Sequence, residues 1–271
     1  MLNPLQEKLL EMFAWLTKYL NDQKLSYYVI GGTFLGAVRH EGFIPWDDDI
    51  DIAMPRPDYE KLIKLLEYPV DNYIVESPKG NAKDYIYAFS KFYDLNTTMT
   101  EKLRKNITRG VFIDIFPLDG IGNNYRESLK NYKKIDRLNM LLAMKVCAYR
   151  KDRVWWKNFA VFLGRFLPVS SKKLAKKIDT LCAEKAFEDS QYVGNLISTY
   201  RAKELMEKTI FGKPVSYKFE NITVFGPEKY DEYLTRLYGD WKKLPPVDKR
   251  HSAHNFLELD LNKQYNYKCL K

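Results

Sequence analysis

The spacing of apolar residues predicts a helix, a strand and a second helix at the start of the chain. Leucine and phenylalanine recur at helical intervals between positions 5 and 20, so we expect an amphipathic helix over residues 4–21. The apolar run 27–30 predicts a short buried strand. It leads directly into Gly31-Gly32-Thr33, where missing side chains permit a tight turn and the close approach of a ligand, before a helix through Val38.

An alternating polar and apolar pattern predicts the next strand, at residues 49–54. Pro55 and Pro57 end this strand, and Pro57 also stands where proline favours the first turn of a helix. We expect further strands at 72–76, 85–93 and 111–116. The first 120 residues therefore predict a mixed α/β unit.

The second half of the chain has a mainly helical pattern. It predicts helical segments over about 124–190 with breaks near Lys151 and Pro168, a hairpin at 215–219 and 222–225, and a helix at 227–238. No internal repeat or low-complexity linker separates it from the first half. We therefore expect a core over residues 1–122 and a mainly helical lobe over residues 123–271 packed against it.

Composition indicates a globular protein with a basic surface. The chain has 271 residues, of which 45% are hydrophobic, and this excludes a disordered protein. The formal charge of +9 favours a polyanionic partner, such as nucleic acid, anionic lipid or a phosphorylated polymer, without selecting one. Cys147, Cys182 and Cys269 lack the spacing of zinc sites or disulfides. The first twenty residues lack a signal-peptide pattern and no apolar run reaches spanning length, so we expect a cytoplasmic protein.

Three aspartates in strands are the candidate catalytic and metal-binding residues. Because side chains alternate along a strand, Asp49 and Asp51 project from one face, while Ile50 and Ile52 point into the core. Two adjacent carboxylates repel each other unless a cation lies between them, and oxygen ligands suit Mg²⁺ or Mn²⁺. Asp114 lies between apolar residues of a later strand and is the natural third carboxylate.

A structural role for these acids is the alternative: residues 47–51 would form an acidic turn, and Asp114 would hydrogen-bond to a loop. The preceding Gly31-Gly32 favours chemistry, because backbone amides after the glycines can hold a phosphate while bound metal neutralises charge on the reacting phosphorus. Together, the glycines and the acids predict phosphoryl transfer.

Two sequence blocks resemble the LicD family. Residues 31–40 and 42–51 read GGTFLGAVRH and GFIPWDDDID, and residues 112–120 read FIDIFPLDG. The resemblance is strong over about 25–120 and weaker in the later segments YGDW at 238–241 and LPP at 244–246. It implies a fold of the DNA polymerase β-like nucleotidyltransferase type, with the metal-binding acids of the family at Asp49, Asp51 and Asp114.

The resemblance also implies an activity, namely transfer of phosphocholine from CDP-choline to a sugar hydroxyl of a teichoic acid or lipopolysaccharide precursor. The implied partners are a CDP-alcohol and a lipid-linked glycan, and no nucleic acid is expected. Asp114 would either complete the metal site or accept the hydroxyl proton. The poorly matched residues 124–210 leave the acceptor open.

Several further residues are candidates for substrate contacts. Arg39 and Lys91 could contact phosphate. Alternatively, Arg39 would pair with an aspartate of the acidic loop, and Lys91 would extend from a sheet edge. Trp46 stands beside the acids and could face a trimethylammonium group, which aromatic rings recognise. His251 and His254 are either phosphate contacts or ordinary surface histidines.

Residues 153–169 combine aromatic and aliphatic residues with flanking lysine and arginine. This segment is too short to span a bilayer but resembles peripheral membrane contacts, here on the inner face of the plasma membrane. A buried helix or a dimer contact is the alternative.

The transferred group could instead be another phospho-alcohol, such as phosphoethanolamine. Two other functions also remain open. A true nucleotidyltransferase would release pyrophosphate rather than CMP, and a non-catalytic basic module would bind polyanions and use the acids structurally.

Overall fold

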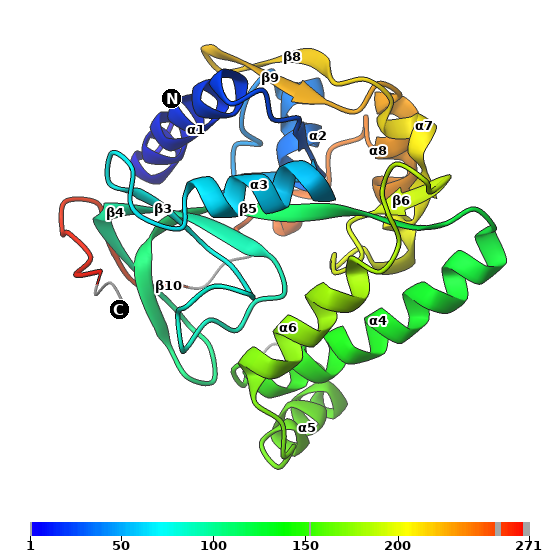
Figure 1. The fold of residues 1–271 in the computed structure, drawn as a ribbon. Coiled ribbons are helices and arrows are strands. Elements are labelled where there is room, and N and C mark those ends of the chain that lie inside the picture. The colour runs from blue at the N-terminus through cyan, green and yellow to red at the C-terminus, as the bar shows by residue number, and fades with distance from the viewer. Residues whose placement is uncertain (1, 152, 253–255, 268–271) are drawn as a thin grey trace.

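A curled mixed sheet lies at the centre of the molecule (Figure 1). The computed structural model describes residues 2–151, 153–252 and 256–267. The sheet is built from Tyr28–Val29 (β1), Asp51–Pro55 (β2), Tyr73–Glu76 (β3), Ser90–Glu101 (β4), Ile107–Gly122 (β5) and Phe256–Asp260 (β10). Its order is β1-β2-β5-β4-β10, and β3 also pairs with β4. Among these pairs, β2 and β5 are parallel and the others are antiparallel.

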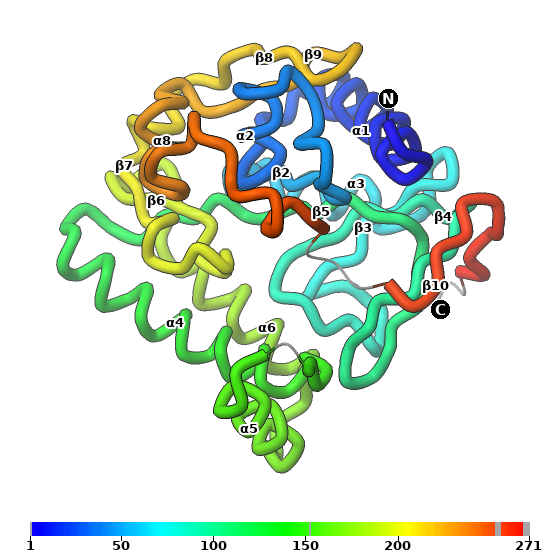
Figure 2. The backbone as a smooth tube through the Cα atoms, turned by 180° about the vertical axis from the view of Figure 1, so that it is seen from behind, coloured from blue at the N-terminus to red at the C-terminus, as the bar shows by residue number. Residues whose placement is uncertain are grey.

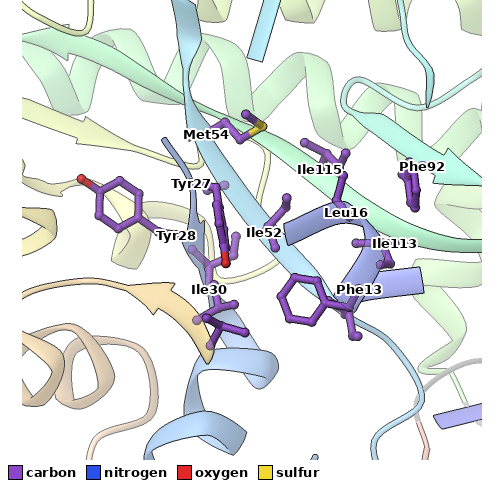
Figure 3. Packing of buried hydrophobic residues seen from close by; sticks show 14 of the residues in the cluster. Phe13, Leu16, Tyr27, Tyr28, Ile30, Ile52, Met54, Phe92, Ile113 and Ile115 are labelled. Carbon is purple, nitrogen blue, oxygen red and sulfur yellow. The ribbon is translucent and has the colours of Figure 1, made fainter. Parts of the chain in front are cut away.

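Three helices from the first half of the chain pack around this sheet: α1 (Pro4–Asp22), α2 (Gly31–His40) and α3 (Arg56–Leu65). A capping box between Asn3 and Gln6 begins α1. The apolar face of α1 meets the sheet, and Figure 3 shows its Phe13 and Leu16 near Ile52, Ile113 and Ile115. These five apolar side chains are fully buried: Phe13, Leu16, Ile52, Ile113 and Ile115.

A helical arm extends from the far end of β5 (Figure 1). It consists of α4 (Tyr125–Val146), α5 (Trp155–Gly164) and α6 (Ser171–Cys182). Buried side chains of α4 and α6, among them Tyr132, Ile135 and Ile178, form a second apolar cluster. Figure 2 shows α5 at the outer end of the arm. None of the helices in the described ranges is long and apolar enough to cross a bilayer.

The rest of the second half continues the sheet beyond β5 and packs against α2. It comprises β6 (Tyr192–Gly194), β7 (Met206–Glu207), α7 (Lys208–Phe211), the hairpin β8 (Val215–Phe219) and β9 (Ile222–Gly226), α8 (Tyr230–Tyr238), and 3-10 turns at 201–204 and 247–249. Phe34 of α2 makes edge-to-face contacts with Tyr217 and Tyr233. Both halves of the chain therefore contribute to the main apolar cluster.

An ion cluster joins the sheet to the helical arm. Arg56 of α3 donates hydrogen bonds of 2.7 Å to both oxygens of Asp119 in β5. It donates another, also of 2.7 Å, to Asp179 of α6. Although burial alone lowers the pKa of Arg56, the two carboxylates raise it above its ordinary value.

The structure confirms the mixed α/β class, the opening helix and the 215–225 hairpin. The strand predicted at 85–93 is wrong in its first half, since β4 begins at Ser90 and continues to Glu101. The residues before it turn back over the strand, where the Tyr85 hydroxyl donates to the Phe89 carbonyl. The strands β6, β7 and β10 were not predicted.

Candidate active site

The glycine turn places the start of α2 directly beneath two carboxylates. Gly31 has φ +54°, which favours glycine, and a Cβ there would lie 3.4 Å from Asp51 Oδ2. A Cβ on Gly32 would lie only 2.8 Å from Asp47 Oδ2. The Thr33 hydroxyl accepts a hydrogen bond of 2.9 Å from the Asp51 backbone N–H. The glycines therefore make room for acids at a helix N-terminus, whose partial positive charge favours anions.

A row of charged residues crosses three neighbouring strands. In the parallel pair of β2 and β5, Asp51 lies opposite Asp114. In the antiparallel pair of β5 and β4, Asp114 lies opposite Lys91. Directly paired residues point to the same face of a sheet, so these three side chains lie side by side. Sequence alone could not supply this register, because it depends on which strands pair.

Lys91 is a buried counter-charge to Asp114. Its ammonium lies 2.9 Å from Asp114 Oδ1, as an ion pair without the alignment of a hydrogen bond, and 3.6 Å from Glu101. It also lies 3.2 Å from the centre of the Phe112 ring and 4.5 Å from that of Tyr87. Because Lys91 is only 2% exposed, its positive charge acts on the carboxylates from the protein interior. The phosphate contact of Lys91 stays a prediction, and in the structure its ammonium faces Asp114.

Crowding of the carboxylates shifts their protonation. Burial raises the pKa of Asp51 well above its usual range, and the charges of Asp49, Asp114 and Asp47 raise it further. Burial also raises the pKa of Asp114 to about 6, against the opposing effect of Lys91. The side chain of Asp114 is 13% exposed. One lysine therefore does not neutralise this group of acids, and the site favours an additional positive charge.

A second arrangement of acids lies directly before β2. Oxygens of Asp47, Asp48 and Asp49 lie within 4.8 Å of one another, a grouping that could hold a metal ion. Asp49 precedes β2, which spans Asp51–Pro55, so the predicted strand began two residues too early and ended one residue too early. The sequence pointed to Asp47 and Asp48 only as an acidic turn. A run of consecutive aspartates was the available signal for them.

Three of the predicted substrate contacts have protein partners in the structure. Arg39 donates 2.8 Å to the Trp241 carbonyl and 3.0 Å to His40 Nε2. Trp46 is half-buried, with the guanidinium of Arg250 5.6 Å from its ring. His251 is exposed, with Nδ1 3.1 Å from the Ser252 carbonyl oxygen, while the other predicted histidine, at position 254, lies outside the described residues.

Tyrosines from the second half of the chain complete the surroundings. The Tyr233 hydroxyl accepts a hydrogen bond of 3.3 Å from the Gly31 backbone N–H. The hydroxyls of Tyr200 and Tyr238 lie 2.7 Å apart. Burial raises the pKa of Tyr200 to about 12, and the charge of Asp51 acts in the same direction. Sequence reasoning missed these tyrosines because aromatic residues at helical spacing usually belong to the core.

Comparison with known proteins decides the family. The family model described as LicD/FKTN/FKRP, nucleotidyltransferase domain, matches residues 24–136, which contain both glycines and all the acids of the site. A protein named lipopolysaccharide cholinephosphotransferase LicD, from Haemophilus influenzae, is 31% identical over 239 residues, covering 85% of this chain and 87% of its own. The chain belongs to the LicD family. It is accordingly a transferase.

Two shorter similarities are to uncharacterized proteins of Rickettsia. One, from Rickettsia typhi, is 32% identical over 114 residues, 42% of this chain and 35% of its own length. The other, from Rickettsia prowazekii, is 45% identical over 47 residues, 17% of this chain and 18% of its own. Neither adds information about activity.

Proposed function

We propose that this LicD-family protein transfers phosphocholine from CDP-choline to a hydroxyl of a cell-surface glycan precursor, of lipopolysaccharide or teichoic acid type. The observation that carries the proposal is the placement of Asp51 and Asp114 in facing register beside the Gly31-Gly32 turn. The cholinephosphotransferase name of the Haemophilus relative supports the choice of group. The nucleotidyltransferase description of the matching family model supports a polymerase β-like core.

The acids of the site fit a divalent cation. The burial of Asp51 among like charges raises its pKa, and a bound cation would reverse that effect. Asp49, Asp51 and Asp114 would hold Mg²⁺ or Mn²⁺, and Lys91 would keep its ion pair with Asp114 Oδ1. When bound, the ion would neutralise charge on the phosphates of the donor.

The residues of the chain then position the reaction. The backbone amides of the first turn of α2 would receive a phosphate oxygen, apart from that of Gly31, which donates to the Tyr233 hydroxyl. The acceptor oxygen forms a bond to the choline-bearing phosphorus, while the bond from that phosphorus to the bridging oxygen breaks and CMP leaves. The hydroxyl proton passes to a carboxylate of the site. Lys91 keeps Asp114 in place throughout, as a positioning residue.

The test is CMP release from CDP-choline with Mg²⁺ and a crude glycan acceptor. We expect release by the wild type and a loss of at least about a hundredfold in Asp49→Asn/Asp51→Asn, because removing charge stabilisation of this kind costs several kcal/mol. Asp22→Asn/Asp189→Asn, which alters two exposed aspartates, should retain wild-type rates.

The products separate the alternatives. Pyrophosphate release from a nucleoside triphosphate, without CMP release, would establish a nucleotidyltransferase instead. Full activity without divalent cation and in the Asp49→Asn/Asp51→Asn variant would show that the acids are structural.

A further inference from the structure

The helix α5 and the residues flanking it carry a dense group of exposed apolar side chains. The members are 44–77% exposed and lie within sixteen residues: Val154, Trp155, Trp156, Phe159, Phe162, Leu163, Phe166 and Val169. Monomeric proteins seldom leave several large aromatic side chains exposed together. The alternative of a buried helix, left open by the sequence, is wrong. We call these eight residues the α5 patch.

The position of α5 is fixed by its opposite face. Trp155, Phe159 and Phe162 follow at intervals of four and three residues and share one side of the helix, whereas Gly164 lies opposite and is buried. A Cβ on Gly164 would lie 2.1 Å from the Met144 carbonyl oxygen of α4. The helix therefore lies directly against α4, and the α5 patch points away from the protein.

Hydrogen bonds from neighbouring segments hold this orientation. Arg104 Nε donates 2.8 Å to the Lys145 carbonyl at the end of α4, and the same side chain reaches the Val161 carbonyl in α5. Lys145 Nζ donates 2.8 Å to the Leu167 carbonyl just after α5. The exposed face is therefore a feature of a well-anchored helix.

Charge identifies the kind of surface that would cover the patch. Residues 145–178 contain ten lysines and arginines and a single acidic residue, Asp152, so they carry the entire +9 excess of the chain. Exposed members of this set include Lys157, Lys173, Lys176 and Lys177. Two copies meeting through the patch would bring two such segments together, and their repulsion disfavours a dimer.

We infer that the α5 patch docks the protein onto a membrane surface containing anionic phospholipid. Aromatic side chains on a short helix fit the apolar zone below the headgroups, and the surrounding lysines meet lipid phosphates. With ten residues α5 lies on a bilayer and does not span it. This inference concerns a surface distinct from the carboxylates and needs no assumption about the donor or the acceptor.

Vesicle sedimentation of the full chain tests the inference. Vesicles of equal parts phosphatidylcholine and phosphatidylglycerol should sediment the wild type at low salt, and pure phosphatidylcholine should sediment far less. Binding should weaken as salt rises, because salt screens charge. Protein that stays in the supernatant with anionic vesicles, or that binds both vesicle types equally, would overturn the proposal.

Two pairs of variants separate the apolar and basic contributions. Trp155→Ser/Phe159→Ser should weaken binding about tenfold or more, whereas Tyr68→Ser/Val247→Ser, with similarly exposed apolar residues elsewhere, should bind as the wild type does.

Lys176→Glu/Lys177→Glu should weaken binding about twentyfold or more, and Lys61→Glu/Lys213→Glu, which makes the same charge change elsewhere, much less. Unchanged thermal unfolding establishes that the variants fold. A wild-type dimer in solution that Trp155→Ser/Phe159→Ser converts to monomer would assign the patch to self-association instead.

Discussion

Lys91 shows how single residues set the electrostatics of the site. It is the buried cation in direct ion-pair contact with Asp114, and the aromatic rings of Phe112 and Tyr87 enclose it. A lysine in this place cannot move to contact a substrate, because its ammonium is held from several sides. Its positive charge stabilises one charged carboxylate in a site that would otherwise disfavour it.

The raised pKa of Asp114 leads to a pH dependence of stability. The folded protein holds this proton up to about pH 6, whereas the unfolded chain releases it near the ordinary value of 3.8. Without divalent cation, the free energy of unfolding should therefore fall as pH rises from about 4 to 6.

Urea unfolding measures this change in the free energy of unfolding. Across this pH range the free energy should fall by roughly 1–2 kcal/mol less in Asp114→Asn than in the wild type. Identical pH profiles for the two proteins would contradict the assigned shift. Comparison of the two proteins is needed because other buried acids, such as Glu204 with its pKa raised to about 7, act in the same direction.

Metal binding should distinguish the two arrangements of acids. Asp51→Asn/Asp114→Asn should abolish the rise in Tm that Mg²⁺ or Mn²⁺ gives the wild type, because two ligands of the bound ion are lost while Asp49, which belongs to both arrangements, is unchanged. Asp47→Asn/Asp48→Asn removes the same charge from the neighbouring group and should retain most of the rise. Differential scanning calorimetry with and without the ion measures both. The opposite ranking would place the ion on the 47–49 group.

Among the elements, α3, β5 and α6 depend on one another through Arg56. Its side chain is 10% exposed and contacts Asp119 and Asp179, which are 0% and 2% exposed. Arg56→Met leaves Asp119 buried without its cation, while Asp179 keeps the Lys79 ammonium at 3.0 Å, and we expect a loss of about 3–5 kcal/mol in the free energy of unfolding. Urea denaturation measures this loss.

A matched variant provides the control for Arg56→Met. Arg126→Met changes an exposed arginine and should alter the free energy of unfolding by less than about 0.5 kcal/mol. If Arg56→Met were equally mild, the ion cluster would not hold the arm to the sheet.

Elements with strong local signals could be predicted from the sequence, and elements defined by distant partners could not. The opening helix and the 215–225 hairpin have a clear period or turn. By contrast, β6 and β7 are short strands that are defined by pairing of β6 with β5 and of β7 with β6. In the site, the motifs located Asp51 and Asp114, but only strand pairing brings them together with Lys91.

At the scale of the whole molecule, the second half of the chain is part of the site's support. Tyr233 contacts the amide of Gly31, and Arg39 of the glycine helix binds the carbonyl of Trp241. These contacts come from segments about 200 residues apart in the chain. No local pattern in either segment predicts them, since each residue also suits an ordinary core or surface position.

The pairing of β10 with β4 has a consequence for the synthesis of the protein. Phe256 lies opposite Glu101, about 155 residues earlier in the chain. A ribosome therefore releases the outer part of β4 long before the strand that covers its edge, and open strand edges recruit other chains. Shortening the chain before β10 should thus appear first as poor yield and aggregation in the cell, before any effect on the chemistry of the site.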